Sequence, residues 1–155
     1  MDKIMEFLRN NIGFSWKGLV VFLLPMIPNI FYFLIPVSDV SGNNVNTHLI
    51  LDVLEHGSQV IFIILLIFIV KKQTSEILCP YTISMAIMLI FYYILWIFCF
   101  TGKANLVILL GMAVIPVIYF ILAEMWLHNY LAIIPTAFFG VMHFIITYMD
   151  FGLKH

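Results

Sequence analysis

The chain has 155 residues, of which 64% are hydrophobic and only 10% are charged. A typical soluble domain is about half apolar and about a quarter charged, so this chain has too few polar side chains to cover a water-facing surface. A mean hydropathy of +1.12 excludes a disordered chain, a coiled coil or an ordinary soluble enzyme. The net charge of −1, with no basic run, argues against nucleic acid as a partner. We expect an all-α integral membrane protein, with the lipid bilayer as its first partner.

Five apolar stretches are long enough to cross a bilayer as helices, which takes about 20 residues for a core ~30 Å thick. They cover approximately residues 18–37, 49–70, 79–100, 104–127 and 130–149. Only His128 and Asn129 separate the last two stretches, which predicts a tight antiparallel hairpin. Continuous apolar runs argue against a membrane barrel, whose strands alternate over about ten residues. The sequence therefore predicts one polytopic domain of five transmembrane helices over residues 1–155.

The positive charges predict the orientation, because cytoplasmic loops retain Lys and Arg. Five basic residues lie before the first stretch or between the second and third: Lys3, Arg9, Lys17, Lys71 and Lys72. Lys103 and Lys154 lie on the other side. With five spans, this distribution places the N-terminus in the cytoplasm and the C-terminus outside.

The N-terminal residues 1–12 are mildly amphipathic, with apolar side chains on one helical face and charged ones elsewhere. This pattern is typical of a short helix in the inner headgroup region, and a solvated tail is the alternative. The apolar stretch that follows is longer than the 7–15 residues usual in a signal peptide, and no clear cleavage site follows it. We expect it to be retained as the first span.

The second predicted span begins with an unusual group of polar residues. Asp52, Glu55, His56 and Gln59 have i, i+3, i+4 and i+7 spacing, so they share one face of a helix. Ionisable groups inside a bilayer are costly, which makes each of them a functional candidate. Only eleven apolar residues separate this group from Lys71, a rise of about 16 Å. The group should therefore lie in the outer half of the bilayer, with Asp52 near its surface.

The other predicted spans place polar, aromatic or helix-breaking residues at a similar depth. These residues are Asn29, Tyr92, Tyr93, Trp96, Pro116 and His143. We expect them to line an outward-facing pocket together with the polar face of the second span. Glu55, His56 and His143 are the candidate metal ligands, although no motif with metal-ligand spacing is present. The structural alternative is that these groups only hydrogen-bond between helices, or that the second span begins later and leaves its first acids in water.

Glu124 lies near the inner end of the fourth span. The simpler interpretation is an interface carboxylate that reaches the cytoplasmic headgroups, and the functional one is an inner gate or a proton exit. Pro25 and Pro28 lie beside Asn29, and a helix that they break could line a cavity with its carbonyl groups.

The segments 24–36 (LPMIPNIFYFLIP) and 51–55 (LDVLE) resemble a pattern in small uncharacterised membrane proteins of Gram-positive bacteria. The resemblance covers the first two predicted spans. It implies a multi-pass protein of a bacterial plasma membrane and brings no known activity.

Three functions are consistent with these features. The first is a binding or transport protein whose pocket takes a small cationic or amphipathic ligand, with Glu55 and Asp52 supplying charge and His56 a proton switch. Five helices without inverted repeats are few for a transporter acting alone, so a homo-oligomer or a partner membrane subunit is expected. The second is an accessory or assembly subunit. The third is an intramembrane lipid-modifying enzyme that uses Glu and His groups, but no HExxH motif or nucleophile elbow supports it, and no cofactor is expected.

Overall fold

The computed structural model describes residues 12–34, 49–69 and 76–152, and helices account for most of them. The helices are α2 (Trp16–Leu34), α3 (Leu49–Phe68), α4 (Pro80–Phe100), α5 (Leu106–Trp126) and α6 (Tyr130–Gly152). Within these ranges the β-structure is limited to an isolated antiparallel bridge between Ile12 and Ile69. The predicted amphipathic segment 1–12 lies, apart from Ile12, outside the described residues.

The prediction of an all-α membrane protein is confirmed at the level of helix type, length and composition. Helices α3, α4, α5 and α6 are each long and apolar enough to span a membrane. Helix α2 has 19 residues, but its described apolar part, Trp16–Tyr32, is shorter than these four. The architecture is therefore that of a multi-pass membrane protein with four clear spanning helices in the described part of the chain.

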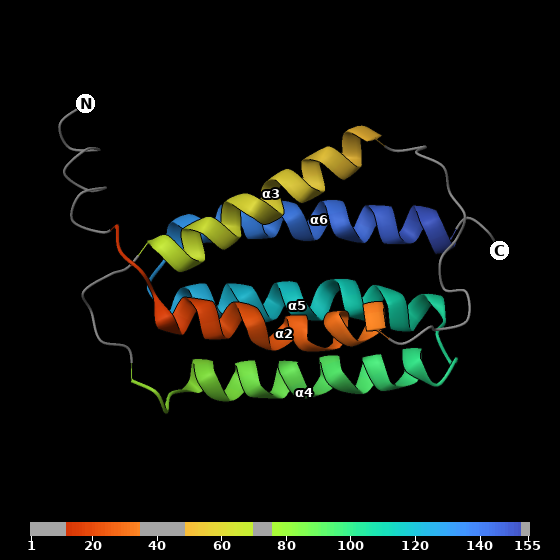
Figure 1. Ribbon diagram of the computed structural model, residues 1–155, viewed down its shortest axis with the longest axis horizontal. Helices are drawn as coiled ribbons and strands as arrows, with labels where there is room; N and C mark the ends of the chain where they lie inside the picture. Colours follow the sequence, from red (N-terminus) through yellow and green to blue (C-terminus); the bar gives the residue numbers. More distant parts are fainter. Residues whose placement is uncertain (1–11, 35–48, 70–75, 153–155) are drawn as a thin grey trace.

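The helices run alternately up and down the long axis of the molecule, so they share two ends (Figure 1). We call the end that holds the start of α2 and the α5–α6 turn the proximal end, and the end that holds Leu34 and Gly152 the distal end. Helix α4 packs on α5, α5 on α6, and α6 on α3, while α2 contacts α3, α4 and α5. Helix α2 thus closes the bundle between α3 and α4, and α3 diverges from the other helices toward the distal end (Figure 1).

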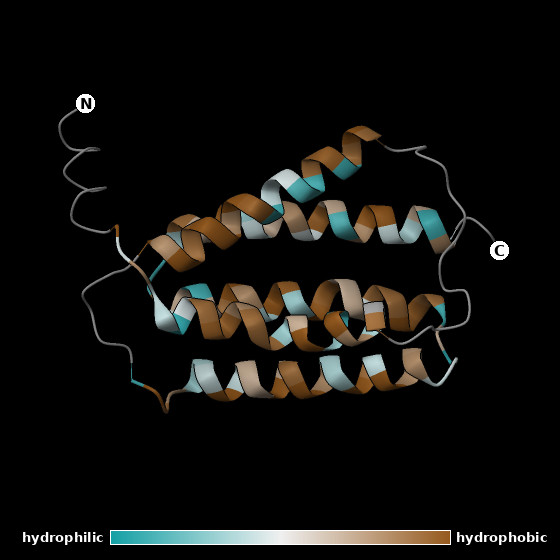
Figure 2. Ribbon diagram, viewed as in Figure 1, coloured by the Kyte–Doolittle hydropathy of each residue, from teal (hydrophilic) through white to brown (hydrophobic). Residues whose placement is uncertain are grey.

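The helices are hydrophobic along most of their length (Figure 2), and many of their large apolar side chains are exposed. On α4, for example, Ile83, Ile90 and Ile97 follow one another at i, i+7 and i+14, and all three are exposed. A surface of this kind is costly in water and suits hydrocarbon.

Two prolines lie inside α2, which nevertheless continues through them. A proline has no N–H, so Pro25 and Pro28 leave the carbonyl groups four residues earlier without their helical donors. Tyrosine hydroxyl groups from neighbouring helices donate to both carbonyls instead. The pairs are Tyr119 Oη with Val21 O at 3.1 Å, and Tyr93 Oη with Leu24 O at 2.6 Å. The prolines therefore attach α2 to α5 and α4 rather than breaking it.

This arrangement predicts an energetic coupling between Tyr93 and Pro28. We expect Tyr93→Phe to lower the free energy of unfolding by about 0.6–1.7 kcal/mol, because the carbonyl of Leu24 loses its donor. In a Pro28→Ala background the restored N–H of residue 28 satisfies that carbonyl, so Tyr93→Phe should cost less. Unfolding of the four proteins in detergent measures the coupling, and additive effects of the two substitutions would contradict it.

The proximal end is held together by hydrogen bonds to the last turn of α3. The amide groups of Gly13 and Ser15 donate to the carbonyls of Phe68 and Ile67 at 3.0 and 2.8 Å. The side chain of Asn129 donates to Leu65 O at 2.7 Å from the α5–α6 turn, where the predicted tight hairpin is found. The amide groups of Gly13 and Ser15 satisfy carbonyl groups that a helix C-terminus leaves without partners, whereas Leu65 O also accepts from the backbone N–H of Ile69 at 3.0 Å.

Candidate functional site

The polar centre of the bundle is a contact between Glu55 of α3 and His143 of α6. Glu55 Oε1 and His143 Nδ1 are hydrogen-bonded. The side chain of Glu55 is 10% exposed and that of His143 is 38% exposed. A carboxyl group inside a membrane protein needs either a cation or a proton, and an imidazole can supply both. Residues 88 positions apart in the sequence therefore form one ionisable unit.

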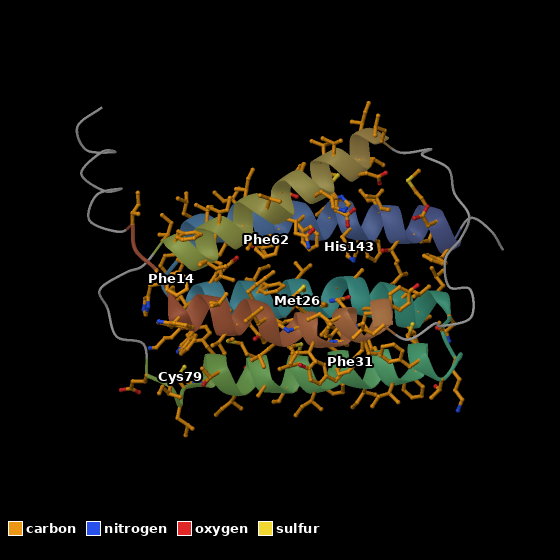
Figure 3. The ribbon with its side chains drawn as sticks, in the orientation of Figure 1. Phe14, Met26, Phe31, Phe62, Cys79 and His143 are labelled. Carbon is orange, nitrogen blue, oxygen red and sulfur yellow. The ribbon has the colours of Figure 1, made fainter. Side chains whose placement is uncertain are left out.

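A cavity of about 450 Å³ lies beside this pair. Its volume falls within the range of about 300–1,000 Å³ that is usual for small-molecule sites. The lining comes from all five helices: Phe22, Met26 and Asn29; Glu55, His56, Gln59 and Phe62; Tyr92; Met112, Ala113, Pro116 and Phe120; Phe139 and His143. In Figure 3, Phe62 and His143 are seen on the α3–α6 side of this region and Met26 on the α2 side.

The polar lining opposite the pair comes from α2 and α4. Asn29 Nδ2 donates to Tyr92 Oη at 3.4 Å and to Pro25 O at 3.2 Å. The side chain of Asn29 is therefore held in place by its own helix, α2, and by the neighbouring helix α4. The site combines one carboxyl, two imidazoles, two amide side chains and a phenol with apolar and aromatic walls.

Three phenylalanines close the cavity on its proximal side. The rings of Phe62 and Phe120 are 5.2 Å apart between centroids, and those of Phe62 and Phe139 are 5.5 Å apart. Phe139 also stacks on His143, with centroids 5.3 Å apart and planes 14° from parallel. All three phenylalanines are buried. We call these three rings the phenylalanine layer; it connects directly to the ionisable pair through His143.

His56 lines the cavity, as expected from the sequence, but only at its exposed edge. Its Nδ1 lies 2.8 Å from the carbonyl oxygen of Asp52 and 3.9 Å from Glu55 Oε2, and its side chain is 72% exposed. His56 thus lies at the edge of the cavity, and the side chain of Asp52 is not part of the lining. Among the described residues, no three His, Cys, Asp or Glu side chains are grouped to hold a metal ion. Glu55, His56 and His143 therefore do not form the metal site considered from the sequence.

Tyr93 and Trp96 lie at the expected depth but do not line the main cavity. They line a separate pocket of about 230 Å³ together with Pro28 and Phe31 of α2. The hydroxyl group of Tyr93 is used by the carbonyl of Leu24. The structure brings together Asn29, Glu55, His56, Gln59, Tyr92, Pro116 and His143, and separates these two aromatic residues and Asp52 from them.

The phenylalanine layer was missed by the sequence interpretation, although its spacing was visible. Phe62 follows Glu55 by seven residues and Phe139 precedes His143 by four, so each lies on the same helical face as its polar neighbour. In a chain that is mostly apolar, large apolar residues are too common for the sequence to show which of them pack beside the ionisable pair.

Glu124 of α5 lies toward the proximal end, away from the cavity. It is 0% exposed, and its Oε1 lies 2.5 Å from Thr136 Oγ1 of α6. It is therefore not an interface carboxylate that reaches the headgroups, because the bundle encloses it.

The chain was compared with known families, curated proteins and solved structures. None of them matches it. The chemistry of the site is therefore inferred from its own geometry: a carboxyl group with a proton-carrying partner at the wall of an apolar and aromatic cavity.

Proposed function

We propose that this chain is a small membrane binding or transport protein whose cavity takes a small cationic or amphipathic ligand at Glu55. The observation that supports this most strongly is that Glu55 provides the one carboxyl group among the residues that line the cavity. Its hydrogen-bond partner there is an imidazole, not a Lys or an Arg. A neutral or protonated imidazole can exchange a proton, whereas a guanidinium keeps its charge permanently.

The proposed binding step is an exchange at the carboxyl group. A ligand cation takes the place of the proton shared by Glu55 and His143, and that proton leaves for solvent. Tyr92 and the phenylalanine layer offer aromatic faces for cation–π contact. Met26 and Met112 supply flexible apolar walls that fit ligands of different shape.

The proposal includes five membrane crossings, with α2 as the first, a cytoplasmic N-terminus and a C-terminus outside. In this orientation the distal end faces outward, and Glu55 lies nearer to that end because it is in the first half of α3. The location proposed is the plasma membrane of a bacterium.

Cysteine labelling of intact cells tests the orientation. A membrane-impermeant maleimide should modify a cysteine placed at Asn44 and spare one placed at Gln73, because the two positions lie on opposite sides in a five-span topology. The reverse pattern would contradict an outward-facing cavity.

The native cysteines must be replaced for this labelling. Cys79 lies just before α4, where hydrogen bonding from the Thr82 backbone N–H lowers the pKa of its thiol, and a maleimide reacts with the thiolate form. Cys99 is buried. A Cys79→Ser, Cys99→Ala background is therefore the control, and it should take up no label.

A second candidate function, an accessory subunit, is favoured by one observation. An apolar groove of about 550 Å³ lies between α3 and α6 on the side away from the cavity, and Gly57 in its wall has open space in front of it. A partner helix could pack there. In that case the purified wild-type protein should bind no cation in the cavity at all.

A further inference from the structure

The strongest unexplained feature outside the cavity is the fully buried carboxyl group of Glu124. Thr136 is the hydrogen-bonding side chain that the described residues offer to it. Its second oxygen, Oε2, has no hydrogen-bond partner among the described residues. A carboxylate in this position would leave a charged oxygen unsolvated, whereas a carboxylic acid would leave only a carbonyl lone pair.

The hydrogen bonds of Thr136 point to the same protonation state. Thr136 Oγ1 lies 2.9 Å from the carbonyl oxygen of Ala132 and 2.5 Å from Glu124 Oε1. A hydroxyl group has one hydrogen, and a backbone carbonyl can only accept. If the Thr136 hydroxyl donates its hydrogen to Ala132 O, it has none left for Glu124. The short contact between Thr136 Oγ1 and Glu124 Oε1 is then a hydrogen bond only when the carboxyl group is protonated and acts as the donor.

The other ionisable groups at the proximal end have different contacts. Lys17 of α2 places its Nζ 5.1 Å from the centroid of the Trp126 ring. The carbonyl of Glu76, before α4, accepts the indole N–H of Trp126. His128, in the α5–α6 turn, has a buried Nδ1 without a hydrogen-bond partner among the described residues. On α6, the group that meets Glu124 is the uncharged Thr136, and the buried residues in the second half of α3, Phe62, Leu66 and Ile67, are apolar.

We propose that Glu124 is a second proton-binding site: its carboxylic acid donates to Thr136 Oγ1, and Thr136 donates to Ala132 O. The site does not depend on the ligand proposed for the cavity.

The phenylalanine layer separates this proton site from the ionisable pair. Thr136, Phe139 and His143 have i, i+3 and i+7 spacing, so they lie on one face of α6. The ring of Phe139 stacks on His143 and packs against Phe62. A proton can pass between the two sites only when these rings move, and a shift of His143 is the event that would move Phe139.

Infrared spectroscopy of the purified protein in lipid nanodiscs tests the site. At neutral pH the wild type should show the carbonyl stretch of a protonated carboxyl group, which shifts in D₂O and is lost in Glu124→Gln. The band should persist in Asp52→Asn, which removes an acid outside the site. The proposal would be overturned if the wild type showed no carboxylic acid band, or if the band that it shows remained in full in Glu124→Gln.

Substitutions at Thr136 keep the test valid if Glu124→Gln fails to fold. Thr136→Ser retains the hydroxyl group and should leave the band in place. Thr136→Val removes the acceptor and should shift the band to higher frequency. Phe139→Ala opens the phenylalanine layer, so hydrogen–deuterium exchange of the band should become faster. A band that is not shifted by Thr136→Val and does not exchange faster in Phe139→Ala would show that the protonated group is not Glu124.

Discussion

Glu55→Gln is expected to weaken binding of a lipophilic cation such as tetraphenylphosphonium by about 10- to 150-fold. The estimate corresponds to the loss of about 1.5–3 kcal/mol, which is typical of one interaction with a charged group. Glutamine keeps the shape and a hydrogen-bonding oxygen but has no negative charge for the cation. Equilibrium binding of radiolabelled cation to purified protein measures the change.

The same exchange predicts a pH dependence. The cation and the proton compete for one carboxyl group, so affinity should fall as pH is lowered, and about one proton should be released for each cation bound in a weakly buffered solution. His143→Gln preserves a hydrogen-bond donor but cannot hold the titratable proton that the imidazole shares with Glu55, so proton release should decrease in this variant.

Asp52→Asn is the matched control for the binding experiment. It removes the same charge three residues earlier on α3, from a side chain that is not part of the cavity lining. Binding in this variant should remain close to wild type. Equal losses in Asp52→Asn and Glu55→Gln would show that the cation is attracted by surface charge, and unchanged binding in Glu55→Gln would end the proposed role of the carboxyl group.

Gly18→Ala is expected to destabilise the fold by about 1–3 kcal/mol or more, the usual cost of overpacking. A Cβ atom on Gly18 would lie 2.2 Å from the carbonyl oxygen of Leu66, so α2 and α3 would have to separate. The contact involves backbone and cannot be relieved by a change of rotamer. The separation would also strain the hydrogen bond from Ser15 N to Ile67 O.

Gly57→Ala provides the comparison for this stability measurement. Gly57 also lies inside an apolar helix, but a Cβ atom there would meet nothing within 4 Å. Alanine is the better helix former by about 1 kcal/mol, so Gly57→Ala should be neutral or stabilising. Thermal unfolding of both variants in the same detergent tests the difference, and equal effects would show that the approach of α2 to α3 is not limited by Gly18.

The helices were predictable because long apolar stretches leave a chain in hydrocarbon few alternatives to internal hydrogen bonding. The structure begins α3 and α6 at the residues where the second and fifth predicted spans begin, Leu49 and Tyr130. The depth of each polar residue was also predictable, because the rise of about 1.5 Å per residue converts its position in a helix into a distance along the helix axis. Asn29, Glu55, Tyr92 and His143 were placed at one level for this reason, and the structure gathers them around one cavity.

The direction in which a side chain points around its helix was not predictable, because it depends on which helices pack together. Tyr92 and Tyr93 are adjacent and equally deep, yet one lines the cavity and the other caps a carbonyl of α2. The same reason explains why His56 lies at the exposed edge of the cavity while Glu55 is buried: the two residues differ by about 100° around α3.

The sequence by itself indicated the apolar environment of this protein, the positions of its helices and the depth of its polar residues. These properties follow from composition and from the rise per residue of a helix. Only the tertiary structure decided which of those residues meet. The pairs Glu55–His143 and Glu124–Thr136 both depend on α6, which packs against α3 on one side and α5 on the other. Contacts between helices are set by the fit of their surfaces, and in an almost uniformly apolar sequence many fits satisfy the same hydrophobic pattern.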